Sequence, residues 1–238
     1  MVSALLPLVL EGVEMRRGGR RILGPLSLTL EGQGVTILMG PNGSGKTSLL
    51  RAMHGLERIN AGRIRWKADL DTARARQAFV FQTPILMRRT VIECIGYPLR
   101  LLGTRRAAMR ERAAAIAAEV GLGEALDKRA SVLSGGERQK LALARALIRA
   151  PEVLFLDEPC ANLDGRATRD IEAILLRARA GGTRIVMSTH DIGQARRLGD
   201  EVVFLHHGRV IEAAGRRAFF ESPRSAEVKS YLNGELLP

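Results

Sequence analysis

The sequence predicts an α/β protein built on a largely parallel β-sheet, with a helical subdomain inserted into it. Short apolar runs bounded by Gly, Pro, Asp or Thr recur along the 238 residues, as buried strands do. Several of these runs are followed by helical stretches, which is the alternation typical of a parallel sheet. Between residues 84 and 133 the pattern changes to alanine- and arginine-rich helix without a strand-like run.

The predicted elements follow from these patterns in chain order. The first strand lies in LLPLVLEG, residues 5–12, which lacks the basic start of a signal peptide. The further strands are Leu26–Leu30, Val35–Met39, Val153–Asp157, Arg184–Ser188 and Glu201–Leu205. The segment RRAAMRERAAAIAAEV, residues 105–120, is the clearest helix of the insertion, and residues 214–238 show no pattern that we interpret. We therefore expect a single domain over residues 1–238, with a helical subdomain at residues 84–133.

Composition narrows the class of partner. Lys and Arg total 37 against 25 acidic residues, a formal net charge of +12, which is common in proteins that meet a polyanion or a membrane surface. The arginines are scattered pairs, however, and Phe, Trp and Tyr total only 9, so we expect no nucleic-acid partner. No apolar run reaches the roughly 20 residues of a membrane helix. Cys94 and Cys160 have no metal-ligand spacing and indicate packed thiols in a reducing compartment.

The strongest motif is GPNGSGKT, which follows the predicted strand Val35–Met39 and precedes a helical stretch. This strand, loop and helix order is the context that a phosphate-binding loop requires. Its glycines let backbone N–H groups converge on phosphates, with Lys46 at the β and γ phosphates and the Thr47 hydroxyl on Mg²⁺. The residues predicted to bind the nucleotide here are Gly40, Pro41, Asn42, Gly43, Ser44, Gly45, Lys46, Thr47 and Ser48.

Two carboxylates follow the buried run VLFL at residues 153–156. Ligand sites of open α/β sheets lie at the carboxyl ends of the strands, so we expect Asp157 and Glu158 near the phosphates. Asp157 is predicted to belong to the Mg²⁺ shell, and Glu158 to be the general base that orients and polarises water. The alternative is that the DEP triplet only ends a strand and begins a turn.

A second glycine loop occurs in LSGGERQ, residues 133–139. Ser134 and Glu137 have the spacing of a capping box, so a well-capped helix is one interpretation. It does not explain Gly135 and Gly136, because glycine costs roughly 1 kcal/mol relative to alanine in a helix. We interpret the bare backbone and the Ser134 hydroxyl as a second anion site.

Six motifs follow one another in the chain: GPNGSGKT, the glutamine of VFQTP, LSGGERQ, VLFLDEP, ANLD and MSTHD. In this combination the chain resembles the nucleotide-binding subunit of bacterial ATP-binding cassette (ABC) transporters, from about Leu8 to Val210. The resemblance implies a P-loop NTPase with a mostly parallel sheet, an antiparallel β subdomain and an inserted α-helical subdomain that ends at the LSGGE loop. It also implies an ATPase with ATP and Mg²⁺ as cofactors.

The resemblance assigns further residues by position. Gln82 would contact Mg²⁺ and water, His190 the γ-phosphate, and Asp164 the dimer interface. The expected catalytic residues are then Glu158, His190, Gln82 and Lys46, with Thr47, Gln82 and Asp157 at the metal and Ser134, Gly135 and Gly136 at ATP. Arg17 falls where the family usually has an aromatic residue on the adenine, and its guanidinium could stack there for about 0.5–1 kcal/mol.

The implied partners are a second cassette, paired head to tail as a homodimer, and separate transmembrane permease subunits. The LSGGE loop of one copy would close over the γ-phosphate bound by the other, and residues 83–101 would contact the permease at the cytoplasmic face of the membrane. The stretch FQTPILMRRTV is similar to importers of oxyanions such as tungstate, molybdate or phosphate, which also use an extracytoplasmic solute-binding protein. The alternatives are a soluble ABC-type ATPase acting on nucleic acid or the ribosome, which the charge of +12 suits, and a cassette without turnover.

Overall fold

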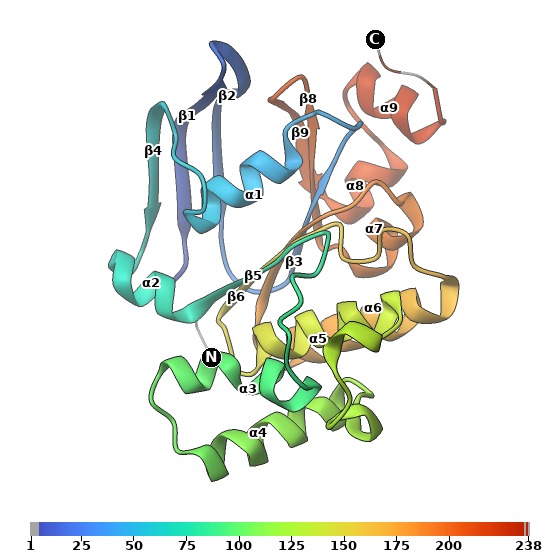
Figure 1. Ribbon diagram of the computed structural model, residues 1–238. Helices are drawn as coiled ribbons and strands as arrows, with labels where there is room; N and C mark the ends of the chain where they lie inside the picture. The colour runs from blue at the N-terminus through green and yellow to red at the C-terminus, as the bar shows by residue number, and fades with distance from the viewer. Residues whose placement is uncertain (1–4, 236, 238) are drawn as a thin grey trace.

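The larger of two sheets organises the protein (Figure 1). In this computed structural model, which describes residues 5–235 and 237, its strand order is β5-β6-β7-β3-β8-β9. The strands are β3 (Val35–Met39), β5 (Gln77–Val80), β6 (Val153–Asp157), β7 (Arg184–Ser188), β8 (Glu201–His206) and β9 (Arg209–Gly215). All neighbours pair in parallel except β9, which is antiparallel to β8. The predicted mostly parallel α/β sheet is confirmed.

The smaller sheet is antiparallel, with the order β2-β1-β4. It consists of β1 (Leu8–Arg17), β2 (Arg20–Leu30) and β4 (Ala61–Trp66). Gly18 and Gly19 link β1 to β2 at positive φ, the backbone that a two-residue hairpin turn requires. The predicted strand Leu26–Leu30 is therefore the second half of a hairpin, with Leu30 opposite Leu8. The antiparallel β subdomain implied by the family resemblance is confirmed.

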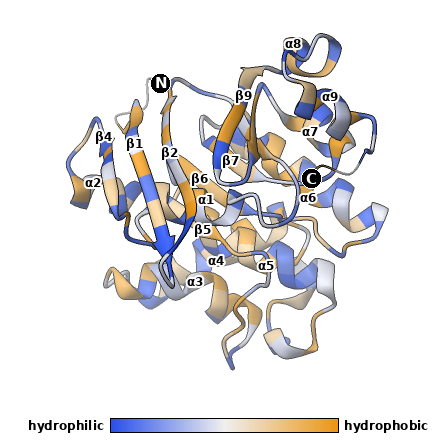
Figure 2. Cartoon of the chain, turned by 90° about the horizontal axis from the view of Figure 1, so that it is seen from above, coloured by the Kyte–Doolittle hydropathy of each residue, from blue (hydrophilic) through white to orange (hydrophobic). Residues whose placement is uncertain are grey.

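Helices cover both faces of the larger sheet. They are α1 (Lys46–His54), α2 (Leu70–Arg76), α3 (Val91–Leu101), α4 (Arg106–Glu119), α5 (Gly135–Leu147), α6 (Gly165–Ala180), α7 (Ile192–Leu198), α8 (Arg216–Glu221) and α9 (Ala226–Leu232). Figure 2 shows α7, α8 and α9 grouped beside β9, away from the three-stranded sheet. Among the described residues, no helix combines the length and the apolar character needed to cross a bilayer.

The region 84–133 carries α3, α4 and two short 3₁₀ turns, η1 (Gly123–Ala125) and η2 (Ala130–Val132). Its only described β pairing outside the named strands is an isolated bridge between Thr90 and Arg129. Figure 1 shows α3 and α4 at the end of the molecule opposite to β1 and β2. The boundary at 84–133 and the single domain over 1–238 stay predictions, and residues 1–4, 236 and 238 lie outside the described part.

Two apolar cores lie on opposite faces of the larger sheet. Alternate residues of a strand point to opposite faces, so Leu38 joins the core shared with α1 and the small sheet, whereas Ile37 and Met39 join the core under α5 and α6. Because these strands are buried on both faces, their sequences are continuous apolar runs rather than alternating apolar and polar residues. Because β3, β5, β6 and β7 are parallel, the loops that follow them emerge at one edge of the sheet.

Candidate active site

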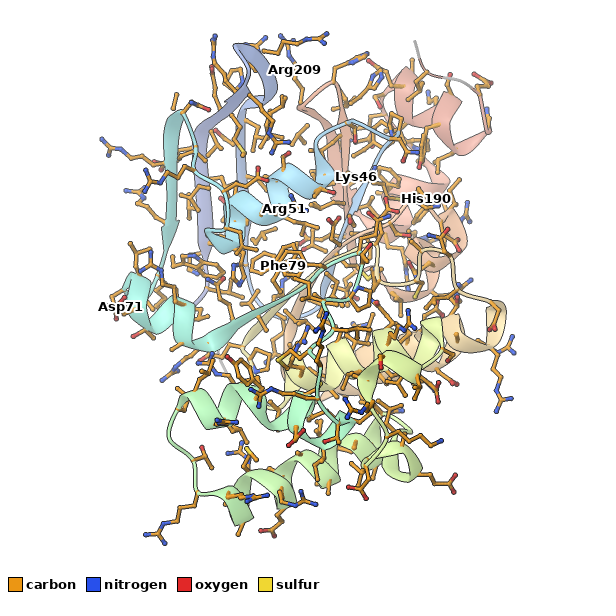
Figure 3. All side chains as sticks on the ribbon, viewed as in Figure 1. Lys46, Arg51, Asp71, Phe79, His190 and Arg209 are labelled. Carbon is orange, nitrogen blue, oxygen red and sulfur yellow. The ribbon has the colours of Figure 1, made fainter. Side chains whose placement is uncertain are left out.

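A pocket of about 560 Å³ opens at that edge and collects most of the predicted residues. Its lining residues come from β1, β2, the phosphate loop and the loops after β5, β6 and β7: Arg17, Ile22, Asn42, Gly43, Gly45, Lys46, Thr47, Ser48, Gln82, Glu158, Ala161, Asn162 and His190. Lys46 and His190, labelled in Figure 3, thus lie on walls of the same pocket. The loops after β3, β5, β6 and β7 meet here because these strands are neighbours in the larger sheet, and Arg17 and Ile22 line the pocket from the smaller sheet.

The backbone of the phosphate loop requires glycine. Gly40 has a φ of +140°, and a Cβ there would lie 2.0 Å from the carbonyl oxygen of Leu205. Gly43 and Gly45 also have positive φ values. The loop is fixed to the β8–β9 turn, since the N–H of Gly208 donates to the carbonyl oxygen of Ser44 at 3.0 Å. The tight path of the backbone follows directly from the GPNGSGKT sequence.

Lys46 places a positive charge inside this loop. Its ammonium donates to the carbonyl oxygens of Gly40 and Pro41 at 2.8 and 3.0 Å, and the residue is only 5% exposed. Burial lowers the pKa of Lys46, while the carboxylates of Glu158 and Asp157 oppose that shift. The helix that begins here, α1, has no side-chain cap and no acidic residue in its first turn. An open helix N-terminus with a buried cation is a ready anion site.

Ser44 provides a test of whether a phosphate fits. Its hydroxyl oxygen is buried and has no hydrogen-bond partner in the described protein. A buried hydroxyl without a partner costs free energy, which a phosphate oxygen in the loop would remove. The residues present therefore fit a bound phosphate chain.

Two hydroxyl groups hold the Asp157 carboxylate, one from Thr47 at the start of α1 and one from Ser188 at the end of β7. Thr47 Oγ1 donates to Asp157 Oδ1 at 2.9 Å, and Ser188 Oγ donates to the same oxygen at 2.8 Å. The carboxylate is 2% exposed, so it lies behind Thr47 rather than in the pocket wall. A hydroxyl and a carboxylate are oxygen donors of the type Mg²⁺ prefers. Among the described residues, no three or more His, Cys, Asp or Glu side chains are placed so that they could hold a metal ion together, so a cation here would depend on phosphate oxygens and water as well.

Glu158 and His190 form the opposite wall. Their closest atoms, His190 Nδ1 and Glu158 Oε2, are 3.1 Å apart, with the side chains 59% and 14% exposed. The backbone N–H of Glu158 donates to Ser188 Oγ at 3.0 Å, and its φ of +44° is unusual for a residue with a Cβ. Strained residues concentrate at functional sites. The arrangement presents a carboxylate that can accept a proton from water.

Gln82 and Arg17 both line the pocket, although their surroundings differ. Gln82 follows β5 and is exposed. Arg17 is the last residue of β1, and its guanidinium donates to Glu57 Oε1 at 3.1 Å. Glu57 Oε1 also accepts from Arg51 of α1 at 3.2 Å. An ion pair thus holds Arg17 in the pocket wall, and its predicted stacking on a base stays a prediction.

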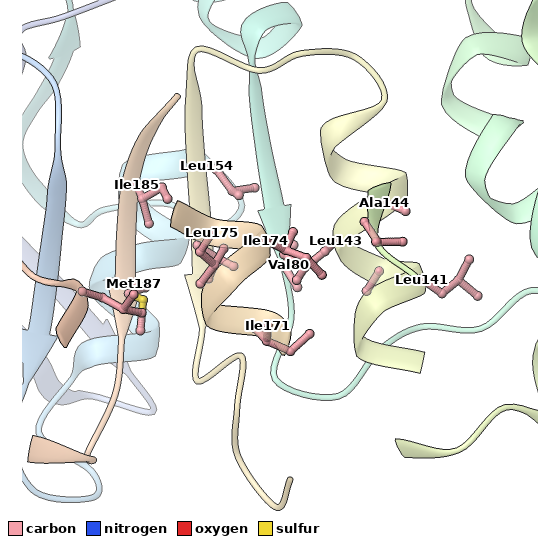
Figure 4. Close-up of a cluster of buried hydrophobic side chains, with 14 of the residues drawn as sticks. Val80, Leu141, Leu143, Ala144, Leu154, Ile171, Ile174, Leu175, Ile185 and Met187 are labelled. Carbon is pink, nitrogen blue, oxygen red and sulfur yellow. The ribbon is translucent and has the colours of Figure 1, made fainter. Parts of the chain in front are cut away.

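The second glycine loop is a complete helix cap. Ser134 N–H donates to Glu137 Oε2 at 2.8 Å, and Glu137 N–H donates to Ser134 Oγ at 3.4 Å, which confirms the predicted capping box. Beyond this cap, α5 packs Leu143 into the core on the side of α6, while Leu141 extends into the same core from the other side of α5 (Figure 4). Of the described residues that line the pocket, none comes from this loop.

The two glycines of this loop have different surroundings. A Cβ on Gly136 would lie 2.9 Å from the Cβ of Ala167 in α6, whereas a Cβ on Gly135 would meet only Leu163 at 3.9 Å. Close packing of α5 on α6 therefore explains Gly136. Asp164, predicted at a dimer interface, caps α6 by accepting from Ala167 N–H at 2.7 Å. Nothing within the described chain requires a glycine at position 135.

Sequence reasoning missed Ser188, whose hydroxyl donates to the Asp157 carboxylate and accepts from the backbone N–H of Glu158. It stands in the MSTHD motif, but a serine at a strand end carries no signal of its partners. Ile22, Ala161 and Asn162 also line the pocket and were missed, because the first two are apolar and a single asparagine has no spacing that predicts a site.

Comparisons with known proteins agree with this geometry. Residues 23–161 match the family model for the ABC transporter domain. Over 200 residues the chain is 40% identical to the tungstate uptake system ATP-binding protein TupC of Peptoclostridium acidaminophilum, an alignment that covers 83% of this chain and 94% of that protein. It is 37% identical to the Fe(3+) ions import ATP-binding protein FbpC of Streptomyces coelicolor, covering 96% and 67% of the two chains.

A similar solved structure is cbiO1 from Clostridium perfringens, described as part of the ABC transporter complex cbiONQ. It superimposes with a TM-score of 0.82 at 26% identity and covers 98% of this chain and 96% of its own. The arrangement of sheets and helices is therefore shared over nearly the whole chain.

Proposed function

This chain belongs to the ABC transporter family, and we propose that it is the subunit whose ATP hydrolysis drives import of a small oxyanion such as tungstate, molybdate or phosphate. Membership makes it an ATP-binding subunit and an ATPase. The observation that carries the hydrolytic proposal is that Lys46, Thr47, Glu158 and His190 line one pocket. In this proposal the chain lies at the cytoplasmic face of a membrane, bound to separate permease subunits.

The chemistry assigned to the pocket uses the contacts described above. Lys46 and the N-terminus of α1 bind the β and γ phosphates. Glu158 accepts the proton of the attacking water, and His190 lies beside it, where it can orient the water or contact the γ-phosphate. Thr47, Asp157 and Gln82 would hold Mg²⁺. When bound, Mg²⁺ neutralises negative charge on the phosphate oxygens.

A second copy of the chain is part of this proposal. Ser134 and Gly135 do not line the pocket of their own chain, and no residue between 5 and 235 packs so closely on Gly135 that a glycine is needed. Both features support a head-to-tail dimer in which this loop meets the γ-phosphate held by the partner.

The oxyanion part rests on the 40% identity to a tungstate uptake protein. The relative at 37% identity is named for Fe(3+) import, so the two relatives point to different cargo. Because cargo contacts lie in other chains, the decisive experiment is uptake by the whole transporter. The tagged chain would be purified from gently solubilised membranes, its stoichiometric partners identified, and the complex reconstituted in vesicles.

ATP-dependent uptake of labelled tungstate, competed by molybdate or phosphate but not by Fe(3+), is the expected result. If the vesicles take up only Fe(3+), the cargo is a metal cation and the oxyanion proposal is wrong. Recovery of ribosomal proteins or DNA in place of a permease would contradict the transport proposal.

The hydrolytic role is tested by Glu158→Gln. The variant keeps the shape of the side chain and loses the base, so we expect ATP binding unchanged and turnover lowered by roughly 10²–10⁴-fold. Glu221→Gln, which changes an exposed carboxylate paired with Arg217, is the matched control and should keep the wild-type rate. Wild-type turnover in Glu158→Gln would remove Glu158 from the mechanism.

A further inference from the structure

The C-terminal segment is built into the catalytic half of the protein. Phe219 of α8 and Val228 of α9 are fully buried in the core under the larger sheet. The carboxylate of Glu212 in β9 accepts hydrogen bonds from the backbone N–H groups of Arg224 and Ser225, at 2.9–3.1 Å. Ser225 then caps α9 through Val228 N–H at 3.2 Å. The start of α9 is thus fixed to the sheet.

Tyr231, in the last turn of α9, extends from this anchored helix to the active site. Its ring packs edge-on against Phe204 of β8, with 5.0 Å between the ring centroids. Its hydroxyl donates to the backbone carbonyl oxygen of His190 at 3.5 Å. Burial raises the pKa of Tyr231, and the nearby negative charge of Glu158 adds to the shift. The phenol therefore keeps the proton that it donates.

The loop that receives this contact carries the ring that meets Glu158. Asp191 N–H donates to Thr189 Oγ1 at 3.1 Å, and Asp191 caps α7 through Gln194 N–H at 2.9 Å. These bonds are local, within five residues of His190. Tyr231 adds a contact from an element 41 residues away, on the peptide of His190 itself. A shift of that peptide would change the 3.1 Å separation between His190 Nδ1 and Glu158 Oε2.

We propose that Tyr231 is a positioning residue, which holds the backbone of His190 so that the imidazole stays within hydrogen-bond distance of the Glu158 carboxylate. α9 thereby supports the rate of hydrolysis without touching ATP. The inference rests on the proposed hydrolytic roles of Glu158 and His190. A small displacement of a catalytic group lowers the rate of the chemical step more than it weakens substrate binding.

The test is Tyr231→Phe, which keeps the ring on Phe204 and removes only the hydroxyl. Thr183, which precedes β7, offers a matched control, because its hydroxyl likewise donates to a backbone carbonyl oxygen, that of Pro151, at 3.0 Å. In the assembled transporter we expect Tyr231→Phe to lower kcat by roughly two- to tenfold, the worth of one hydrogen bond. KM for ATP and the thermal midpoint should be unchanged in Tyr231→Phe, and Thr183→Val should keep the wild-type kcat.

Hydrogen exchange of residues 188–192 gives an independent readout, because a loosened loop exchanges faster even when the fold is intact. A wild-type kcat in Tyr231→Phe would overturn the inference, as would a loss of kcat matched by a lower thermal midpoint. His190→Ala separates the two proposals. If that variant retains full turnover, the hydrolytic assignment fails, whereas an inactive His190→Ala beside a fully active Tyr231→Phe overturns only the role of Tyr231.

Discussion

The helices α1 and α5 each begin at a glycine loop, and they differ in whether a side chain caps the N–H groups of the first turn. α1 begins after Gly45, which is in the left-handed conformation, and has neither a side-chain cap nor an acid in its first turn. α5 begins after Ser134, whose hydroxyl forms a reciprocal cap with the carboxylate of Glu137. The positive end of α1 is therefore open to an anion, whereas that of α5 already has a carboxylate partner.

The contrast between these two helix N-termini indicates which glycine loop belongs to a binding site that one chain forms alone. Lys46, Glu158 and His190 all face the pocket beside α1. Of the described residues, none in the loop at α5 lines that pocket, and none makes a contact that requires glycine at the exposed position 135. We interpret the first loop as the binding site and the second as a half-site that a partner's nucleotide completes. The following predictions test that distinction.

The largest expected effect is at Gly40. A Cβ there would lie 2.0 Å from the Leu205 carbonyl, so Gly40→Ala should distort the phosphate loop and weaken ATP binding by roughly 100-fold or more, about 3 kcal/mol. Gly43→Ala is the control, because it introduces positive-φ strain of about 1 kcal/mol without a contact within 4 Å. Calorimetric titration with ATP measures both variants. Equal affinities would show that the loop does not depend on this close approach.

At the second loop, Ser134→Arg should separate binding from turnover. ATP binding to the isolated chain should stay within about twofold of wild type, because Ser134 does not line the pocket. Turnover should fall by roughly 10² or more, as expected when a donor to the transferred phosphate is lost and the dimer cannot close. Unchanged ATPase activity in an isolated dimer would reduce this loop to a helix cap.

The two glycines of this loop should respond with opposite signs. Gly136→Ala crowds Ala167 and should lower the free energy of unfolding by about 1–3 kcal/mol. Gly135→Ala has room and should raise it by up to about 1 kcal/mol through helix propensity, yet lower turnover if a phosphate must approach the backbone. Denaturant unfolding together with ATPase assays measures both. A Gly135→Ala variant with full activity would contradict the half-site.

The smallest effect concerns pH. The backbone N–H of Ser134 lowers the pKa of Glu137 below its ordinary value of 4.5, so the ionised form is favoured in the folded state. Its contribution to stability is present above about pH 4.5 and is lost as the pH falls through the lowered folded pKa. Near pH 7 the free energy of unfolding of the wild type should exceed that of Glu137→Gln by no more than about 0.5 kcal/mol, since the site is exposed. That difference should vanish in acid, and a difference that grew in acid would contradict the sign.

The sequence could predict features that depend on neighbours along the chain. The glycine spacing of the phosphate loop and the four-residue capping box are local, and both appear as expected. The approach of Asp157 to Thr47 could be predicted as well, because parallel strands end at one edge of a sheet. This rule places strand ends without any knowledge of side-chain packing.

Features that depend on contacts between residues far apart in the sequence have no local sequence pattern that predicts them. The role of Ser188 requires the pairing of β6 with β7, which sets it opposite Asp157. The need for Gly136 comes from Ala167 on another helix, and Tyr231 lies in a tail that had no interpretable pattern. β4 was missed because its six residues are exposed or only partly buried, so the apolar signal of a core strand is absent.

The most direct test of the half-site mixes two inactive chains. Lys46→Ala removes the cation of the phosphate loop, and Ser134→Arg blocks the second loop. In a head-to-tail dimer, a mixed pair retains one complete site, formed by the phosphate loop of one chain and the second loop of the other. We expect mixing of equal amounts to restore roughly a quarter of wild-type ATPase activity, since half of the dimers carry one of two sites. No recovery from a mixture verified to contain mixed dimers would show that the second loop does not act on the partner's nucleotide.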